Sequence, residues 1–377
     1  MLLNAHIFGV GGAANKACIE LMNTIPELTN SITLVNTTMK DIPLEYRDKA
    51  IELSGPFKGC GKERDKANKI MLDNLKAGTL DYVYDPEDAM CIVATSSEGG
   101  TGSGGSIMLA KYLHSVYKMH VHFYIFTGFG DDGRSLKNTV DLFQELDEDY
   151  SVQAISNAKF LTEANGNRVK AEELANKKFC DDVKILLGGY INESEQNIDE
   201  SDLLKIDKTP GYMVIENIKL DKIKNVNDYN TKLIEALDSS KNLNFDPTCK
   251  RYGLILNIKS READFVDYSN SILKERYGMP FESFLHIQDV YQDNEVQLIV
   301  SGLKLPKEDI IETYETFIDA TKKVDVSKDE FFSMEMDTNA DGFDNLSKTS
   351  KVDVVKAKAD FFNEKPNEPK LKTNTEF

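Results

Sequence analysis

A run of small residues from 98 to 106, EGGTGSGGS, is the part of the sequence best suited to ligand chemistry. It follows the apolar run AMCIVATSS and precedes the helical pattern IMLAKYL. Between a strand and a helix, such a loop lets backbone N–H groups approach phosphate oxygens, and the helix N-terminus adds partial positive charge. Ordinary strand-to-helix connections are short. The five glycines of this run therefore predict an anion-binding loop rather than a flexible turn.

A second glycine loop, GVGGAANK at residues 9–16, also follows an apolar run. Alone it fits G-x-G-x-x-A, the dinucleotide fingerprint of dehydrogenases, which needs an acid about 20 residues later. The next apolar run ends instead in Asn36. A Walker-type P-loop is excluded because the chain has no G-x-x-x-x-G-K-[ST] sequence. Two such loops favour a mononucleotide held from both sides, and a nicotinamide-dependent oxidoreductase stays open as the alternative.

The elements that position these loops are read from short apolar runs in the first 160 residues. These runs are rich in β-branched and aromatic residues and alternate with helical patterns, which predicts an α/β fold with a parallel sheet. Ligands in such folds bind at the carboxyl ends of the strands. The runs are AHIFGV, SITLVN, MCIVAT, VHFYIF and VQAIS.

The remainder of the chain predicts a long central helix, a second, smaller α/β domain, a C-terminal helix and a tail. Pro306 opens the last helix, since proline suits a first helical turn. Residues 329–347 hold six acids and no Lys or Arg, so the tail is expected to be disordered when unbound. The predicted parts are a nucleotide-binding domain (1–167), the central helix (168–192), a catalytic loop with the start of the next helix (193–210), the second domain (211–305), the last helix (306–325) and the tail (326–377).

Composition limits the partners and the compartment. Asp and Glu outnumber Lys and Arg by 63 to 45, so the body as a whole should repel nucleic acid and anionic membranes, and contact with DNA should be local or indirect. The five scattered cysteines indicate reduced thiols rather than disulfides or a zinc site, and no protein ligand for a metal is assigned. No apolar run is long enough to span a membrane. We therefore expect a cytoplasmic protein with no membrane partner.

Several motifs together resemble the tubulin/FtsZ superfamily. GGTGSG at residues 99–104 is similar to the GGGTGSG signature, and GVGGAANK resembles the first glycine loop of that family. LVNTT, GCGKERDKA, IFTGFGDDGRS and ISNAKFL resemble later family motifs in the right order, so the similarity covers roughly residues 1–325. The resemblance implies a GTPase of the tubulin/FtsZ fold, with GTP or GDP as the ligand.

The resemblance also implies the nucleotide contacts. The phosphates would lie against both glycine loops and against the family's third loop, here GCGKERDKA at residues 59–67. Asp132 would contact the ribose, and Asn157 and Asp181 would read the guanine edge. Two positions depart from the family. Lys177 stands where an aromatic residue stacks on the base, with Phe179 nearby, and Glu98 replaces a third glycine. Glu98 is expected to point into solvent, with a water on Mg²⁺ as the alternative contact. The implied phosphate and loop residues are Gly11, Gly12, Asn15, Asn36, Gly61, Lys62, Gly99, Gly100, Thr101, Gly102, Ser103 and Gly104.

The hydrolytic acids are predicted from NIDESD at residues 197–202. It matches the family motif N-x-D-x-x-D, which is supplied by the next subunit of a filament. The resemblance implies that Asn197, Asp199 and Asp202 complete a site in which the carboxylates polarise the attacking water. A site split between head-to-tail subunits generates an open filament, so hydrolysis, with Mg²⁺ on the nucleotide, should follow assembly.

Within the superfamily, the drift in the loops and the lysine-containing tail most resemble the TubZ group of plasmid and phage partition tubulins, including the clostridial phage type. The resemblance implies DNA segregation through a DNA-binding adaptor of the TubR type, docked on the tail. An FtsZ-like cytokinetic or other structural filament is the alternative. The tail segment DTNADGFDNLSK begins like a calcium-binding EF-hand loop, but Lys348 occupies the position of the bidentate Glu, so calcium binding is not expected.

Overall fold

A computed structural model describes residues 2–56, 58–81, 90–191, 198–220, 222–258, 263–289 and 294–322. The predicted catalytic residue Asn197 and the whole predicted tail, including the EF-hand-like segment, lie outside the described residues. Within the described residues, no helix combines the length and the apolar character that crossing a membrane requires.

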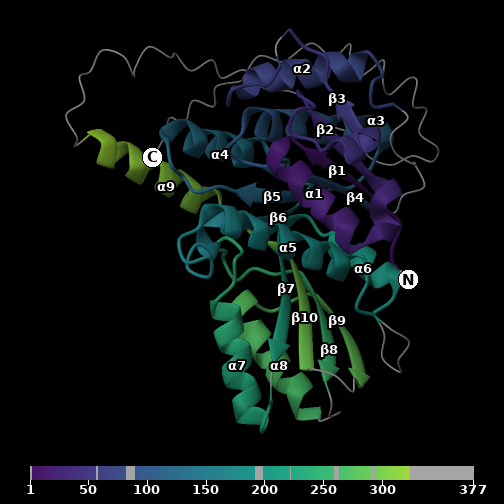
Figure 1. Ribbon diagram of the computed structural model, residues 1–377. Coiled ribbons are helices and arrows are strands. Elements are labelled where there is room, and N and C mark those ends of the chain that lie inside the picture. Colours follow the sequence, from purple (N-terminus) through teal and green to yellow (C-terminus); the bar gives the residue numbers. More distant parts are fainter. Residues whose placement is uncertain are drawn as a thin grey trace, which may run out of the picture.

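The described strands form one ten-stranded, mostly parallel sheet in the order β3-β2-β1-β4-β5-β6-β7-β10-β8-β9 (Figure 1). The pairs from β3 to β7 are parallel, β10 is antiparallel to both of its neighbours, and β8 and β9 are parallel. This arrangement confirms the predicted α/β fold. The strands are β1 Ala5–Val10, β2 Ile32–Asn36, β3 Ala50–Glu52, β4 Met90–Ser96, β5 Val121–Thr127, β6 Ser151–Ser156, β7 Gly211–Leu220, β8 Arg251–Ile258, β9 Glu282–Asp289 and β10 Asn294–Leu303.

Helices cover both faces of the sheet, because alternate strand residues point to opposite sides and both sets are apolar. On one face, Ile7 and Ile92 share a core with α1 (Gly12–Thr24) and α5 (Arg168–Leu186). On the other face, Phe8 and Val93 share a core with the remaining large helices. Those helices are α2 Arg64–Lys76, α3 Ser106–Tyr117, α4 Gly133–Glu145, α7 Val226–Asp238 and α8 Ala263–Tyr277.

The strands of the predicted second domain extend the same sheet. β7 pairs with β6 through Ser151–Gln153 and Gly211–Met213, and then continues into the lower part of the molecule with β8, β9 and β10 (Figure 1). The short helix α6 (Glu200–Asp207) precedes β7, and Leu203 and Ile206 bury it in the same core as α1 and α5. The predicted domain boundary at residue 211 therefore falls at the first residue of β7, a strand that pairs with β6 on one side and with β10 on the other.

The central helix α5 runs antiparallel to the strands of the first domain. At its start, the Arg168 guanidinium binds Asp131, which lies in the loop after β5 (Nη2–Oδ1 2.7 Å). At its end, Leu187 accepts a hydrogen bond from Leu3 N–H, just before β1 begins. The helix stops at Leu186, earlier than the predicted residue 192, because Gly188 turns the chain with a φ of 79°. Therefore α5 joins the carboxyl edge of the parallel strands to their amino edge.

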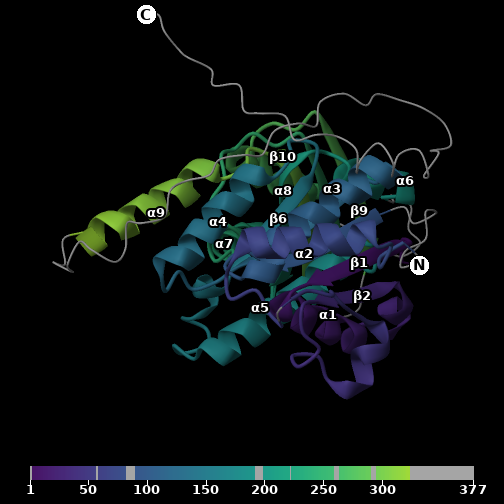
Figure 2. The same ribbon diagram turned by 90° about the horizontal axis from the view of Figure 1, so that it is seen from above.

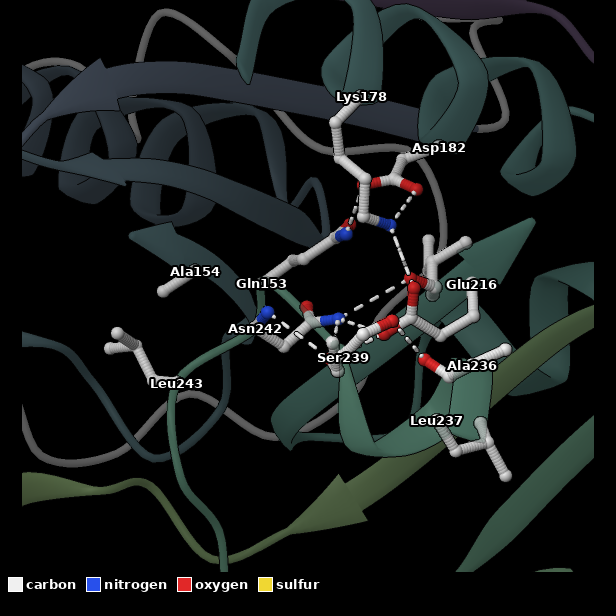
Figure 3. A network of polar contacts seen from close by, with 12 residues as sticks. Gln153, Ala154, Lys178, Asp182, Glu216, Ala236, Leu237, Ser239, Asn242 and Leu243 are labelled. Carbon is white, nitrogen blue, oxygen red and sulfur yellow. Dashed lines mark hydrogen bonds and ion pairs between the residues drawn. The ribbon is translucent and has the colours of Figure 1, made fainter. Parts of the chain in front are cut away.

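A buried polar network fixes the middle of α5 to the sheet (Figure 3). The Lys178 ammonium lies 2.7 Å from Asp182 Oδ1 and 3.3 Å from Glu216 Oε2 on β7. Asp182 also accepts hydrogen bonds from Tyr124 of β5 and Gln153 of β6. Two carboxylates thus share one cation, and burial raises the pKa of Asp182 to about 7. The network joins α5 to three strands of the sheet.

The C-terminal helix α9 (Lys307–Lys322) lies beside α4, and its far end extends beyond the rest of the body (Figures 1 and 2). Phe317 packs against Gly133, the first residue of α4, where a Cβ would lie 3.2 Å from the ring. The start of α4 is therefore covered by the last described helix.

Candidate nucleotide-binding site

The two predicted glycine loops meet at the carboxyl edge of β1 and β4. Gly11 has a φ of 87°, and a Cβ on it would lie 3.0 Å from the backbone nitrogen of Gly102. The Thr37 hydroxyl, just after β2, lies 3.0 Å from the Thr101 hydroxyl. The first loop is also held to β2 by the Gly11 N–H, which donates to Val35 O. Glycine at position 11 thus permits both the backbone conformation and the close approach of the loops.

The second glycine loop is partly helical. Residues Thr101–Gly105 form a turn of π-helix that leads directly into α3. Its glycines permit contact with the third loop, since a Cβ on Gly100 would lie 2.8 Å from Glu63 N and one on Gly104 would overlap Arg64 O. Three loops from distant parts of the chain therefore come together, as an anion-binding cradle requires.

Replacing Gly11 by Ala is expected to weaken nucleotide binding by at least about tenfold. Gly11 combines a φ of 87° with a ψ of 167°, a conformation that costs a non-glycine residue about 1–3 kcal/mol, and the new methyl group would push Gly102 away. Titration of a fluorescent GTP analogue and denaturant unfolding check this. Gly166→Ala is the control, because Gly166 has a φ of 78° but nothing lies within 4 Å of its Cβ position. Equal losses of affinity in the two variants would contradict the proposed role of the close approach.

Several buried polar atoms at this edge lack a hydrogen-bond partner in the protein. The side chains of Asn15 and Asn36 are almost fully buried, yet Asn15 Oδ1 and Asn36 Nδ2 are unpaired. Ser106 Oγ, at the start of α3, and Asn157 Oδ1, just after β6, are also unpaired. An unpaired buried polar atom is costly, so donors and acceptors at this edge fit a polar ligand such as a nucleotide.

Lys62 and Asp132, predicted to contact phosphate and ribose, bind each other. The Lys62 ammonium lies 2.7 Å from Asp132 Oδ2 and donates to Ser135 Oγ. Asp132 also caps α4 by accepting the Ser135 N–H. The Lys62 hydrogen bond, followed by the Ser135 N–H, lowers the pKa of Asp132 to about 2. Asp132 is therefore a carboxylate at neutral pH and couples the third loop to the loop after β5.

Glu98 does not point freely into solvent, so that expectation is wrong. Its half-buried carboxylate accepts the Gly130 N–H at 2.8 Å. Gly128 makes room for it, because a Cβ there would overlap the carboxylate. Burial raises the pKa of Glu98. The glutamate that replaces a glycine thus joins the second glycine loop to the loop after β5.

Phe179 and Asp181, which the sequence predicts near the guanine base, both lie on α5. Phe179 is fully buried and packs against Tyr124 and Phe126, with ring centroids 4.7 and 5.7 Å apart, so it is not available to stack on a base. Asp181 lies exposed on α5. Sequence analysis left the stacking partner open, and burial excludes Phe179, the aromatic residue that it named near this position. Lys177, which occupies the family's stacking position, is exposed on the same helix.

Sequence analysis missed Arg64 and Asn138. Arg64 is buried, donates to Ser103 O at 3.2 Å, and makes two hydrogen bonds to Glu145. Asn138 Nδ2 donates to the carbonyls of both Lys62 and Glu98 at 3.0 Å. Through these hydrogen bonds, both side chains join the second glycine loop to the third loop. The only signal in the sequence was Arg64 within the third loop motif.

The predicted acids Asp199 and Asp202 form a capping box at the start of α6. Asp199 accepts the Asp202 N–H at 2.9 Å, and the Asp199 N–H donates to Asp202. They follow the end of α5 at the amino edge, whereas the glycine loops lie at the carboxyl edge. The 19 residues of α5 span about 28 Å between the two edges. Within one chain, the fold does not bring the acids to the cradle.

In the described part of the chain, no cluster of three or more His, Cys, Asp or Glu side chains is arranged to hold a metal ion. The cradle is thus built from backbone N–H groups, hydroxyls, amides and single charged side chains.

Comparison with protein-family models and with curated protein sequences gives no match. Solved structures do match. Clostridium botulinum phage c-st TubZ, truncated at its C-terminal tail, has a TM-score of 0.66 and 18% identity over 85% of this chain and 98% of that chain. Bacillus thuringiensis serovar israelensis TubZ, in a GTPγS-form protofilament, has a TM-score of 0.71 and 14% identity over 86% and 95%.

CetZ2 from Haloferax volcanii, as a GTPγS-bound protofilament, matches with a TM-score of 0.70 and 16% identity over 85% of this chain and 100% of that chain. Each of these similarities covers 85% or 86% of this chain. Because the identities are low, they establish architecture rather than activity. The chain therefore shares the fold of the TubZ and CetZ structures, as the resemblance of its motifs led us to expect.

Proposed function

We propose that the protein is a GTPase that polymerises head to tail into dynamic filaments and completes its hydrolytic site between subunits. The observation that carries the proposal is the separation of cradle and acids to opposite edges of the sheet. Stacking one subunit on the next would bring the acids of α6 onto the neighbour's cradle. Two of the similar structures are GTPγS protofilaments, which supports both the nucleotide and the assembly.

In this proposal, the two edges of the sheet have different functions. At the carboxyl edge, the loop N–H groups and hydroxyls bind the phosphates, and Asn157 and Asp181 read the guanine. A Mg²⁺ ion bound with the nucleotide would neutralise part of the phosphate charge. At the amino edge, Asp199 and Asp202 orient a water of the neighbouring site in line with the γ-phosphate. Asn197, which lies outside the described residues, is proposed to contribute to the same contact. Phosphoryl transfer depends mainly on such positioning and on electrostatic stabilisation.

GTP turnover per molecule is expected to be almost absent at low protein concentration and to rise sharply above a threshold, because a single subunit lacks half of the site. Phosphate release and light scattering, measured together across a concentration series, check this. The two thresholds should coincide. Turnover strictly proportional to protein concentration, with no threshold, would contradict a shared site.

We further propose that the filaments segregate plasmid or phage DNA through a DNA-binding adaptor of the TubR type docked on the tail. The similarity to two TubZ structures supports this role. The net charge of −18 also favours indirect contact with DNA. A cytokinetic or other structural filament is the second candidate, supported by the equally similar CetZ fold.

Deleting residues 331–377 separates these two roles. For a partition protein, we expect the truncated chain to polymerise with an unchanged threshold and to lose recruitment of the adaptor–DNA complex. Sedimentation of filaments with a labelled complex of the adaptor and its DNA measures both properties. Unchanged recruitment after the deletion would contradict docking on the tail.

A nicotinamide-dependent oxidoreductase finds less support. Asn36, at the end of β2, stands where that function needs an acid, and its Oδ1 is already engaged by the Thr37 N–H. The second glycine loop also meets the first at Gly11 and Gly102, which a single dinucleotide fingerprint does not require. Competition between NADH and GTP in a binding titration distinguishes the two ligands.

A further inference from the structure

The far end of α6 is held by polar groups buried in the sheet. Asp207, the last residue of the helix, lies with Oδ1 2.9 Å from Nδ1 of His122 on β5. Both side chains are about 1% exposed. Because a carboxylate oxygen accepts, Nδ1 of the imidazole donates. This contact joins a surface helix directly to a central strand of the first domain.

The backbone of the same helix end is also anchored. The Asp207 carbonyl is one of the last four carbonyls, which a helix leaves without an internal partner. It accepts from the Ser151 hydroxyl on β6 and from His120 Nε2, which lies 3.0 Å away. Two residues later, the Thr209 hydroxyl accepts from the Arg251 guanidinium on β8 at 2.8 Å. Three strands therefore hold the end of an eight-residue helix.

This polar anchor is not the arrangement that stability alone would favour. His122 Nε2 and Asp207 Oδ2 are buried without a hydrogen-bond partner. A carboxylate at a helix C-terminus is also opposed by the helix dipole. Apolar side chains of similar volume commonly stabilise such a position better, whereas buried polar pairs fix one arrangement of elements. The pair thus defines where α6 sits relative to the sheet.

Fixing this end fixes the other, because a two-turn helix is about 12 Å long and stiff. Asp199 and Asp202 lie at its first turn, and Leu203 and Ile206 bury the face between. A displacement of about 1 Å in a reacting group can lower a rate by about 100-fold. The position of the acids therefore depends on the contact between His122 and Asp207.

We propose that His122 is a positioning residue for hydrolysis, acting through Asp207 to set where a subunit presents Asp199 and Asp202 to its neighbour. This inference rests on the proposed function of the chain. It assigns a role in chemistry to a strand residue that lies in the first domain but serves the nucleotide of a different subunit.

The test uses the full-length protein with three substitutions: His122→Leu, which removes the donor, His122→Asn, whose amide nitrogen can replace Nδ1 as the donor, and Asp207→Leu, which removes the acceptor. For His122→Leu, we expect turnover within filaments to fall about 100-fold, while the affinity for a fluorescent GTP analogue and the assembly threshold stay within about twofold of wild type. His122→Asn is expected to recover at least about half of the turnover.

A purely structural role would instead lower thermal stability, nucleotide affinity, assembly and turnover together, and that result would overturn the proposal. Normal turnover by His122→Leu in filaments would also overturn it. Should His122→Leu fail to fold, Asp207→Leu carries the same test from the other side of the contact, because it removes the oxygen that accepts from His122 Nδ1. The wild-type protein separates the two hypotheses: lack of GTP binding or of assembly there contradicts the proposed function itself.

Discussion

Replacing Asp199 by Asn is expected to lower GTP turnover in filaments by at least about 100-fold, the usual loss when a placed acid–base group is removed. Asn caps a helix about as well as Asp, so the capping box that Asp199 forms with Asp202 should keep α6 in place. Asp199→Ala is also expected to leave filaments in the GTP form, but it removes the cap, which costs about 1 kcal/mol. Asn therefore isolates the chemistry from the fold.

The measurement is phosphate release per subunit in pelleted filaments, together with the nucleotide content of the pellet. The mutant filaments should hold mostly GTP, whereas wild-type filaments should hold mostly GDP. Glu200→Gln is the matched control, since Glu200 is an exposed acid on the next residue. Turnover by Asp199→Asn within about twofold of wild type would show that the acids of α6 do not perform the hydrolysis.

Replacing Lys178 by Met is expected to destabilise the protein by about 3–5 kcal/mol at pH 7, because it leaves two buried carboxylates without their shared cation. Lys178 is only 14% exposed, and it bridges Asp182 on its own helix to Glu216 on β7. Denaturant unfolding monitored by circular dichroism measures the loss. Lys177→Met, at an exposed position on the same helix, is the control and should change stability by less than about 0.5 kcal/mol.

The destabilisation should depend on pH in a defined direction. The pKa of Asp182 is raised to about 7 in the folded state, above about 3.9 in an unfolded chain. The folded state therefore keeps a proton that the unfolded state has lost, so this group lowers wild-type stability as the pH rises from about 4 to about 7. The loss caused by Lys178→Met should be smaller at pH 5, where Asp182 is protonated. A loss equal at both values would contradict this assignment.

The sheet could be predicted from sequence where strands are buried on both faces. β1, β2, β4, β5 and β6 are continuous apolar runs, and each was placed within about a residue of its observed bounds. β3 was missed because its three residues are half-buried and too few to form a pattern. α6 was predicted only as a loop and the start of a helix, since D-x-x-D differs from the usual capping box sequence.

The candidate site could be predicted only as far as backbone chemistry determines it. Glycines identified the loops, because close approach and positive φ leave few other residues possible. The partners of charged side chains depend on contacts across the fold. Lys62 and Asp132 are 70 residues apart, and nothing near either one indicates the pair. The role of Glu98 likewise depends on its contact with the Gly130 N–H, which the sequence around Glu98 does not indicate.

The antiparallel course of α5 determines which assemblies could be active. Because α5 separates the cradle from the acids, a closed two-fold dimer would place two like edges together. Neither nucleotide in such a dimer would be hydrolysed. An open stack always has one complete site fewer than it has subunits. Every break in a polymer would thus separate one bound nucleotide from the acids of its neighbour. That nucleotide would lie at a new end and would not be hydrolysed, so fragmentation itself would create ends that are protected from hydrolysis.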